Sequence, residues 1–548
     1  MQPFLRTIAI AAAALTAAGC SGGTRTASLP PVAGVGGPSH RMTHARLVIN
    51  VPPRKHVKKI RVHGHYVSPA TASLTYTVTP ALAGGATSGE IDINTSNPNC
   101  TVTGVVGYLS CTLDIAGIVP STPYTFSFTT FDGAGGTGDV LSANDNVPFT
   151  ATPGANNTLA ATLGGVASSL VVTPITPYRM TGTSAALTVY GNDAVKFTVT
   201  PVDAQDNFII GPGAPQPTVS LAPGAHATLA AVGSTSPNEW TLTSTYEPSD
   251  PAMPSTATLN VSATPVPGSG ASTLSSAIQT KLYQPWIYIA DLGSGTVSAY
   301  DEDGNVKIAP GSAFPGLASG ALGIAYDSDN GWLYIGDETP EVTAYDRLGN
   351  VKVASFPVAG AQPLGMAFDS NNHLIYVGGN DNGVIAAYDA HGNLQSTPGG
   401  FPFGATGPRQ MAFDPRTNQL YAAFDNMGTI LVYDESGAAV VTSGGFPNVP
   451  HNYLTNCAGY DPIHGWIWTC DYNSIAAYDG DGNLEVGPTL NDGAGSIDLA
   501  FDQYNGSIYV TNQNPNTNLS VYDQQVHERS LPAPVQGLSI PVGIVVVK

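Results

Sequence analysis

The side chains of this sequence that could bind or transform a ligand gather in its second half, and several of them directly follow an apolar run. A carboxylate recurs at the same point of successive segments, and a ring of such groups could hold a divalent cation such as Ca²⁺. The members of this set that we take as candidate ligand-binding residues are Asp337, Asp425 and Asp471. Because the position recurs, capping of a turn by the carboxylate explains it better than ligand binding does.

Four polar side chains depart from this recurring pattern and are better candidates for contact with a ligand. They are Arg409, Gln410, His451 and Asp498. No Gly-x-Ser-x-Gly elbow occurs, and no glycine-rich phosphate loop follows a strand and opens a helix. We therefore predict no catalytic residue, and the sequence favours binding over catalysis.

Two short segments resemble the first half of a calcium-binding loop, namely Asp301–Asn305 and Asp479–Asn483. Both lack the bidentate Glu that completes such a loop at position 12. They occupy the same hairpin turn of a repeat, so turn formation explains them better. No cofactor is predicted. Binding of Ca²⁺ remains an alternative only because Asp and Asn oxygens are suitable ligands.

A repeat that begins near residue 280 carries these side chains. A hydrophobic-Tyr-Asp element recurs six times at intervals of 43 to 45 residues, from Tyr300-Asp301 to Tyr522-Asp523. Each unit contains four short strand-like runs separated by Gly, Asn and Asp turns. This length and strand number are typical of one blade of a β-propeller.

The two ends of the repeat array predict ring closure. The first copy starts at Trp286 without an inner strand, whereas Pro541–Lys548, after the last copy, aligns with the inner strand Pro363–Asp369. We expect this C-terminal strand to complete the first blade, because pairing both ends removes the exposed edges of an open array. Residues 280–548 are therefore predicted to form a six-bladed β-propeller.

The repeat pattern Pro-x-Gly-hydrophobic-Ala-aromatic-Asp, followed by Gly-x-Leu-Tyr-Val and Val-x-Ala-Tyr-Asp-x-x-Gly-Asn, resembles NHL-type and related six-bladed propellers over the whole last domain. The resemblance implies the fold, but such propellers include receptors, scaffolds, lactonases and lyases. Streptogramin lyases use a Glu-x-His pair, which is absent after residue 280. Lactonases of the gluconolactonase type use a Glu at the start of an inner strand, also absent. A divergent metal-dependent lyase or lactonase is the alternative function.

The middle of the chain predicts two further all-β units. Residues 45–165 and 166–264 each contain strand-like runs with Gly and Asn turns, and each has the length of a β-sandwich. They loosely resemble the Ig-like modules that serve as spacers in bacterial surface proteins. A segment rich in Pro, Gly and Ser, residues 265–279, is predicted to be a linker.

The N-terminus has the pattern of an export signal. Residues 1–20 contain Arg6, an apolar stretch and small residues before Cys20, which resembles a bacterial lipobox with an acylated cysteine. Leu15 lies two residues further back than the usual Leu, so a plain secretory signal is the alternative. Residues 21–44 are predicted to be a flexible stalk. We expect Cys20 to tether the protein to a lipid bilayer.

The remaining four cysteines form two pairs that are close in sequence, Cys100 with Cys111 and Cys457 with Cys470. Each pair is flanked by strand-like residues, and export would place the chain in an oxidising compartment. We therefore predict two disulfides across hairpins. Metal binding is the weaker alternative, because neither pair is accompanied by a Cys-x-x-Cys motif or paired histidines.

The charge distribution limits the partners. The chain has a formal net charge of -20, although residues 1–61 contain no Asp or Glu. An acidic body repels phosphates, so we predict no nucleic-acid partner. Around residues 54–65 a basic cluster could rest on an anionic membrane, or could simply be a solvated stretch beside an edge strand.

Three hypotheses follow for the function. The preferred one is an extracytoplasmic lipoprotein of the bacterial cell envelope whose propeller binds a protein, a glycan or a small ligand without catalysis. The second is the divergent lyase or lactonase, and the third is a purely structural envelope protein. The sequence does not identify the ligand or the oligomeric state.

Overall fold

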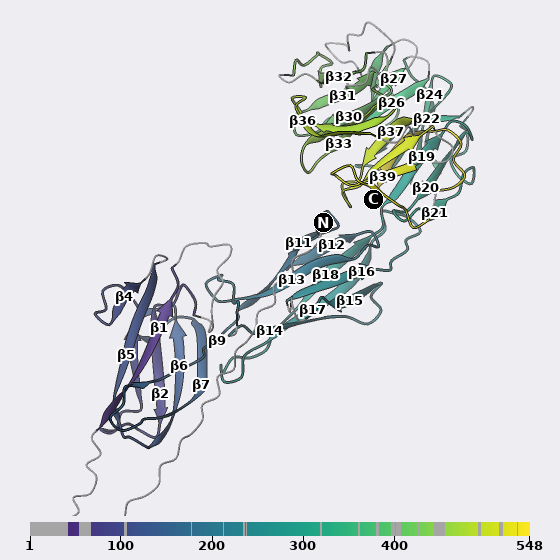
Figure 1. Ribbon diagram of the computed structural model, residues 1–548. Coiled ribbons are helices and arrows are strands. Elements are labelled where there is room, and N and C mark those ends of the chain that lie inside the picture. Colours follow the sequence, from purple (N-terminus) through teal and green to yellow (C-terminus); the bar gives the residue numbers. More distant parts are fainter. Residues whose placement is uncertain are drawn as a thin grey trace, which may run out of the picture.

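The computed structural model describes most of the chain from Met42 onward. The described residues are 42–53, 67–103, 107–176, 178–211, 213–233, 236, 238–317, 320–359, 362–379, 383–395, 401, 407–424, 427–442, 446, 455–490, 495–513, 519–533 and 535–548. Predictions for the signal segment, Cys20, the stalk up to residue 41 and the basic cluster fall outside these residues. The predicted end of the stalk at residue 44 is wrong, because Thr43 and His44 already belong to strand β1 (Thr43–Val51). Three all-β bodies follow one another along the chain, two sandwiches and a propeller (Figure 1).

The first sandwich consists of two sheets and one short 3-10 helix, η1 (Ala134–Gly136). One sheet has the order β4 (Cys100–Thr103), β5 (Tyr108–Ile118), β1 (Thr43–Val51), β8 (Asn157–Thr158). The other has the order β3 (Ser88–Asp92), β2 (Ser73–Thr79), β6 (Pro123–Phe131), β7 (Val140–Thr150), β9 (Gly164–Gly165). Burial alternates along β1, because successive side chains of a strand point to opposite faces and only one face packs on the core.

The second sandwich also has two sheets. The first has the order β10 (Ser169–Pro174), β13 (Val195–Val202), β16 (Glu239–Ser244), β15 (Ala227–Ala231). The second has the order β11 (Met180–Thr183), β12 (Ala186–Tyr190), β18 (Leu274–Tyr283), β17 (Ser255–Thr264), β14 (Gln216–Leu221). Phe197, Trp240 and Leu242 belong to the apolar core between these sheets.

The predicted linker at residues 265–279 is wrong in its second half. Residues 274–283 form β18, which pairs antiparallel with β17 and parallel with β12. Ile278, Thr280 and Leu282 alternate with exposed residues and are buried, so this segment completes the sandwich core. The propeller therefore begins at β19 with Trp286, and not at residue 280.

Six sheets form the blades of the propeller. Blade 1 has the order β21 (Val306–Ile308), β20 (Thr296–Tyr300), β19 (Trp286–Asp291), β41 (Pro541–Val547). Blade 2 contains β22 (Ala321–Asp327), β23 (Trp332–Asp337), β24 (Glu341–Asp346) and β25 (Val351–Pro357). Blade 3 contains β26 (Pro363–Asp369), β27 (Leu374–Gly379), β28 (Ile385–Tyr388) and β29 (Leu394–Gln395).

The remaining blades continue in the same order. Blade 4 contains β30 (Gln410–Asp414), β31 (Gln419–Phe424) and β32 (Thr429–Asp434), with a single bridge between Tyr433 and Ala439 in the place of an outer strand. Blade 5 contains β33 (Cys457–Asp461), β34 (Trp466–Cys470), β35 (Ser474–Tyr478) and β36 (Leu484–Leu490). Blade 6 contains β37 (Ser496–Phe501), β38 (Ile508–Asn512), β39 (Leu519–Tyr522) and β40 (Glu528–Arg529).

The predicted ring closure is confirmed. Strand β41 pairs antiparallel with β19, with Ile289 opposite Ile544, so the two ends of the array share blade 1. Each inner strand contacts the inner strand of the next blade, and β41 contacts both β37 and β22. Strand β19 is buried along its whole length, because neighbouring blades cover both faces of a blade.

Both predicted disulfides are present, Cys100–Cys111 and Cys457–Cys470. In each case the two cysteines are directly opposite each other in an antiparallel hairpin. Disulfides of this kind fit an oxidising, extracytoplasmic compartment. No helix in the described part of the chain has the length and apolar character of a membrane span.

Candidate functional site

The antiparallel strands of the blades divide the propeller into two ends. Loops between second and third strands and loops leading into inner strands lie at one end, which we call the mouth end. The hairpins between first and second and between third and fourth strands lie at the other, which we call the turn end. Of the seven predicted site residues, Asp425 and His451 are outside the described residues. The other five lie toward the mouth end, on or beside strands β30, β37, β23 and β34.

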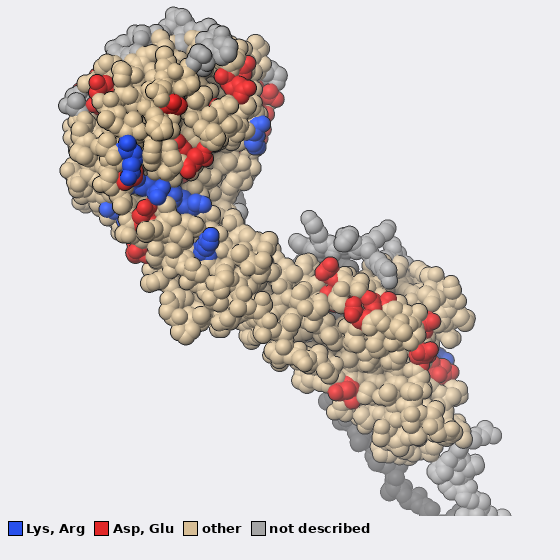
Figure 2. All heavy atoms as spheres, turned by 180° about the vertical axis from the view of Figure 1, so that it is seen from behind, with Lys and Arg blue, Asp and Glu red and all other residues tan. Residues whose placement is uncertain are grey.

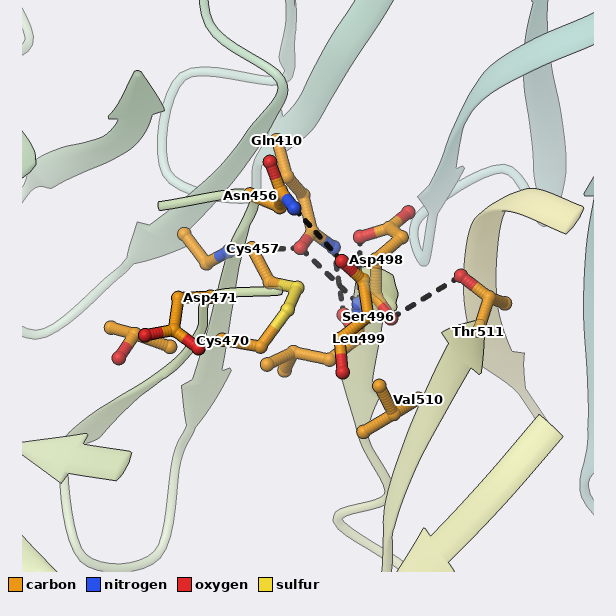
Figure 3. Close-up of a disulfide and its surroundings, with 12 residues drawn as sticks. Gln410, Asn456, Cys457, Cys470, Asp471, Ser496, Asp498, Leu499, Val510 and Thr511 are labelled. Carbon is orange, nitrogen blue, oxygen red and sulfur yellow. Dashed lines mark hydrogen bonds between the residues drawn. A yellow bond between two sulfur atoms is a disulfide. The ribbon is translucent and has the colours of Figure 1, made fainter. Parts of the chain in front are cut away.

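Gln410 joins three blades. It is the first residue of inner strand β30 and is only 9% exposed. Its Nε2 donates to the carbonyl of Leu499 in blade 6 at 2.7 Å, and its Oε1 accepts from the amide of Ala458 in blade 5 at 2.8 Å. The side chain therefore links inner strands whose residues lie 48 and 89 positions away (Figure 3).

Asp498 joins blade 6 to the closing strand. Its Oδ2 accepts from the amide of Ile544 in β41 at 3.0 Å, and its Oδ1 accepts from the amide of Leu499 at 2.8 Å. Burial raises the pKa of Asp498 well above its usual range, because a charged carboxylate is poorly solvated there. The described bonds of this carboxyl group stabilise the ring.

A third polar side chain completes this set. Asn456, at the start of the blade 5 inner strand, donates from Nδ2 to the carbonyl of Ser496 at 2.8 Å. Gln410, Asn456 and Asp498 therefore all bond backbone groups of other inner strands, beside the Cys457–Cys470 disulfide (Figure 3). Ligand binding by Gln410 and Asp498 stays a prediction, because both already serve the closure of the ring.

The recurring acidic residues cap turns, as the repetition predicted. Asp337 accepts from the amide of Thr339 at 2.8 Å, and Asp471 accepts from the amide of Asn473 at 2.8 Å. The hairpins that resemble calcium loops behave in the same way, since Asp301 accepts from the amide of Asn305 at 2.8 Å. These carboxylates satisfy backbone amides within their own loops.

Blade 5 keeps three unsatisfied oxygens near the mouth end. Asp471 Oδ2, Thr455 Oγ1 and Ser474 Oγ are buried without a hydrogen-bond partner in the described part of the chain. Buried polar atoms are nearly always paired, so these three oxygens are exceptions to the usual pattern. Among the described residues no group of three His, Cys, Asp or Glu is arranged to hold a metal ion.

The turn end carries a site that the sequence did not predict, where the second sandwich docks. Arg179 donates to Glu302 of blade 1 at 2.6 Å and pairs with Asp193 at 2.7 Å. Arg347 of blade 2 pairs with Asp250 of the sandwich at 2.9 Å. Figure 2 shows basic side chains around the neck between the two bodies.

A cavity of about 240 Å³ lies within this junction, lined in part by Arg179, Glu302, Asn505 and Arg529. Next to it, burial raises the pKa of Asp502 to about 7. The negative charge of Glu302 also raises this pKa, whereas the hydrogen bond from the Tyr504 amide and the positive charge of Arg179 lower it. Sequence reasoning missed this junction because Arg179 and Glu302 lie 123 positions apart. No local motif signals such a pair.

Comparison with known proteins does not assign this chain to a family. No protein-family model matches the chain, and no curated protein matches it. One similar solved structure is the crystal structure of a nidogen/laminin complex, at 16% identity and a TM-score of 0.39, covering 48% of this chain and 98% of that one. Another is the crystal structure of a mitotic checkpoint complex, at 17% identity and a TM-score of 0.34, covering 45% of this chain and 74% of that one.

Proposed function

We propose that this chain is a lipid-anchored extracytoplasmic binding protein of the bacterial envelope, in which two sandwiches present the propeller to its ligand. The ligand is a protein, a glycan or a small molecule, and it binds at the mouth end without being turned over. The observation that carries the proposal is that the second sandwich docks on the turn end, through pairs such as Arg179–Glu302 and Arg347–Asp250. This leaves the opposite, mouth end uncovered by the sandwich.

The anchor is supported by the small residues before Cys20 and by the stalk-like composition of residues 21–44. Two disulfides agree with export. On this proposal the sandwiches are Ig-like spacers and the propeller is of the NHL type.

The two sandwiches are suited to act as a spacer because hydrogen bonds join them, one of which is buried. Ser68, in the first sandwich, donates to Asp203 of the second at 2.5 Å, and Asp203 is fully buried. Gln205 donates to Asp132 of the first sandwich at 2.6 Å. A spacer with such contacts keeps the propeller at a set distance from a membrane.

Metabolic labelling tests the anchor. The full chain, expressed in a bacterium supplied with labelled palmitate, should carry the label and fractionate with membranes. The Cys20→Ser variant should lose the label and leave the membrane fraction. An unlabelled wild-type chain would contradict lipid anchoring and favour the plain secretory signal.

A thermal-shift screen of the Cys20→Ser chain tests binding at the mouth end. The probes are hexoses, amino sugars, uronic acids and short peptides of envelope proteins. A probe at 100 times its Kd should stabilise the fold by about 2.7 kcal/mol. The Arg409→Ala variant at the mouth end should lose this shift, whereas Arg529→Ala at the turn end should keep it. A shift lost only in Arg529→Ala would place the ligand at the junction instead and contradict the proposal.

A further inference from the structure

A cluster of three tyrosine rings encloses the ammonium group of Lys548 at the junction of sandwich and propeller. The Nζ atom lies 5.0 Å from the ring centroid of Tyr283, 5.4 Å from that of Tyr190 and 5.5 Å from that of Tyr504. A cation within about 6 Å of an aromatic centroid is attracted by the negative face of the ring. We call these three rings the tyrosine cage.

The cage is assembled from two domains. Tyr190 and Tyr283 are register partners at the ends of the parallel strands β12 and β18, and their rings stack at 5.8 Å. Tyr504 lies in the turn between β37 and β38 of blade 6, and its ring centroid is 4.9 Å from that of Tyr190. The sandwich therefore supplies two walls and the propeller supplies the third.

Local hydrogen bonds hold the three tyrosines of the cage in place. The amide of Gly191 donates to the carbonyl of Tyr283 at 2.9 Å, which keeps the two sandwich strands aligned. On the propeller side the amide of Tyr504 donates to Asp502 at 2.7 Å. Burial raises the pKa of both Tyr190 and Tyr504, so the phenols stay neutral and act on the cation through their rings.

The cation comes from the strand that closes the ring. Lys548 directly follows β41, which pairs with β19, and its main-chain oxygen accepts from the hydroxyl of Tyr326 in blade 2 at 3.3 Å. Within the described residues Lys548 forms no ion pair with a carboxylate, so the rings are its main source of attraction. Occupation of the cage thus connects the closing strand to the second sandwich.

We propose that Tyr190, Tyr283 and Tyr504 form a binding site for an alkylammonium group, that the Lys548 side chain is its ligand, and that this occupancy holds the closed propeller on the second sandwich. The site adds to the ion pairs of the junction. It differs from them because its attraction needs both a cation and an aromatic face, and not a carboxylate.

Reductive methylation with ¹³C-formaldehyde tests the occupancy in the wild-type chain. The protein contains eight lysines, and each dimethylated lysine contributes a signal to a proton–carbon NMR spectrum. The signal of Lys548 should lie upfield of the others because of the tyrosine ring currents, and it should vanish in Lys548→Arg. A spectrum without an upfield signal would overturn the proposal, and this measurement requires no substitution in the cage.

Matched substitutions separate the rings from their hydroxyl groups. In Tyr504→Phe the aromatic face is kept, so the upfield shift should persist. In Tyr504→Leu this face is lost, and the Lys548 signal should move part of the way toward the position of the exposed lysines, because Tyr190 and Tyr283 remain. Equal behaviour of the two variants would show that ring faces do not hold the cation.

The hydrogen exchange of one backbone amide reports whether the two domains stay docked. Asn192 of the sandwich donates its backbone N–H to Glu302 of the propeller at 2.6 Å, so its hydrogen exchange reports an open junction. Lys548→Met keeps an unbranched side chain of similar length without its charge and should speed this exchange several-fold. The control Lys352→Met, in blade 2, should leave it unchanged. An unchanged rate in Lys548→Met would contradict a role of the cage in docking.

Discussion

Asp291 Oδ2 accepts the backbone amide hydrogen of Ser539 at 2.6 Å, which joins two residues 248 positions apart. The same carboxylate accepts from the amide of Ile540 at 2.8 Å and from the amide of Gly293 in its own loop at 3.0 Å. Asp291 ends β19, and Ile540 directly precedes β41. The carboxylate thus fixes the closing strand at the point where it enters the ring.

Replacement of this carboxylate should weaken ring closure. We expect Asp291→Ala to lower the free energy of unfolding of the propeller by about 2–3 kcal/mol, because several hydrogen bonds to a charged acceptor are lost. Urea denaturation followed by tryptophan fluorescence measures this, since Trp286, Trp332, Trp466 and Trp468 all lie in the propeller.

The control for Asp291 is Asp389→Ala. Asp389 is also an acidic turn residue, but it accepts from His391 and Asn393 within one hairpin. Its loss should cost less than the loss of Asp291. Equal losses would show that Asp291 acts only as a local turn residue.

Gln410→Ala should destabilise the propeller by about 1–3 kcal/mol, because the amide of Ala458 and the carbonyl of Leu499 would lose a buried partner. The urea midpoint of this variant is to be compared with that of Gln503→Ala, an exposed glutamine of blade 6. A wild-type midpoint for Gln410→Ala would contradict the structural role and favour a side chain reserved for a ligand.

A double-mutant cycle should show strong coupling between Arg179 and Glu302. Their side chains are 8% and 6% exposed, so Arg179→Met leaves a buried carboxylate without its main cation and should cost about 3 kcal/mol. The pair Arg179→Met with Glu302→Gln should cost less than the sum of the single changes. Denaturation of the four proteins measures the coupling.

Lys196→Met is the matched control for a surface pair. The Lys196 side chain is 51% exposed and that of its partner Glu239 is 20% exposed, so the change should cost at most about 1 kcal/mol. Additive losses at Arg179 and Glu302 would contradict a tight junction.

Stability should fall from weakly acidic to neutral pH because of Asp502. The unfolded chain releases this proton near pH 4, whereas the folded chain retains it to about pH 7, since burial raises the pKa. The folded state binds more protons in this window, so the free energy of unfolding decreases as pH rises, by about 1.4 kcal/mol per unit.

Asp502→Asn should remove the part of this dependence that is due to Asp502, and should be more stable relative to wild type at pH 8 than at pH 5. Denaturation of both proteins at the two pH values provides the measurement. Asp523→Asn is the control of opposite sign. Hydrogen bonds from His527 and Gln525 outweigh partial burial and lower the pKa of Asp523, so its contribution is lost as pH falls. Parallel curves for wild type and Asp502→Asn would contradict the assignment.

Much of the fold is readable from the sequence because its signals are local. The six-fold Tyr-Asp repeat predicted the blades, and Pro541–Lys548 predicted the closing strand that pairs with β19. Both disulfides were predictable because hairpin cysteines face each other across adjacent strands. The missed strand β18 also had a signal, the alternation of Ile278, Thr280 and Leu282, which the surrounding Ser, Gly and Pro residues concealed.

The sequence by itself therefore determined the blades, the ring closure and the cross-strand disulfides, since short strands, turns and hairpins depend on residues close along the chain. Only the tertiary structure decided what Gln410, Asp498, Arg179 and Lys548 do. Their partners lie on other blades or another domain, and the strength of a buried hydrogen bond, ion pair or cation–π contact depends on distance and desolvation in space. Sequence separation carries no information about either quantity.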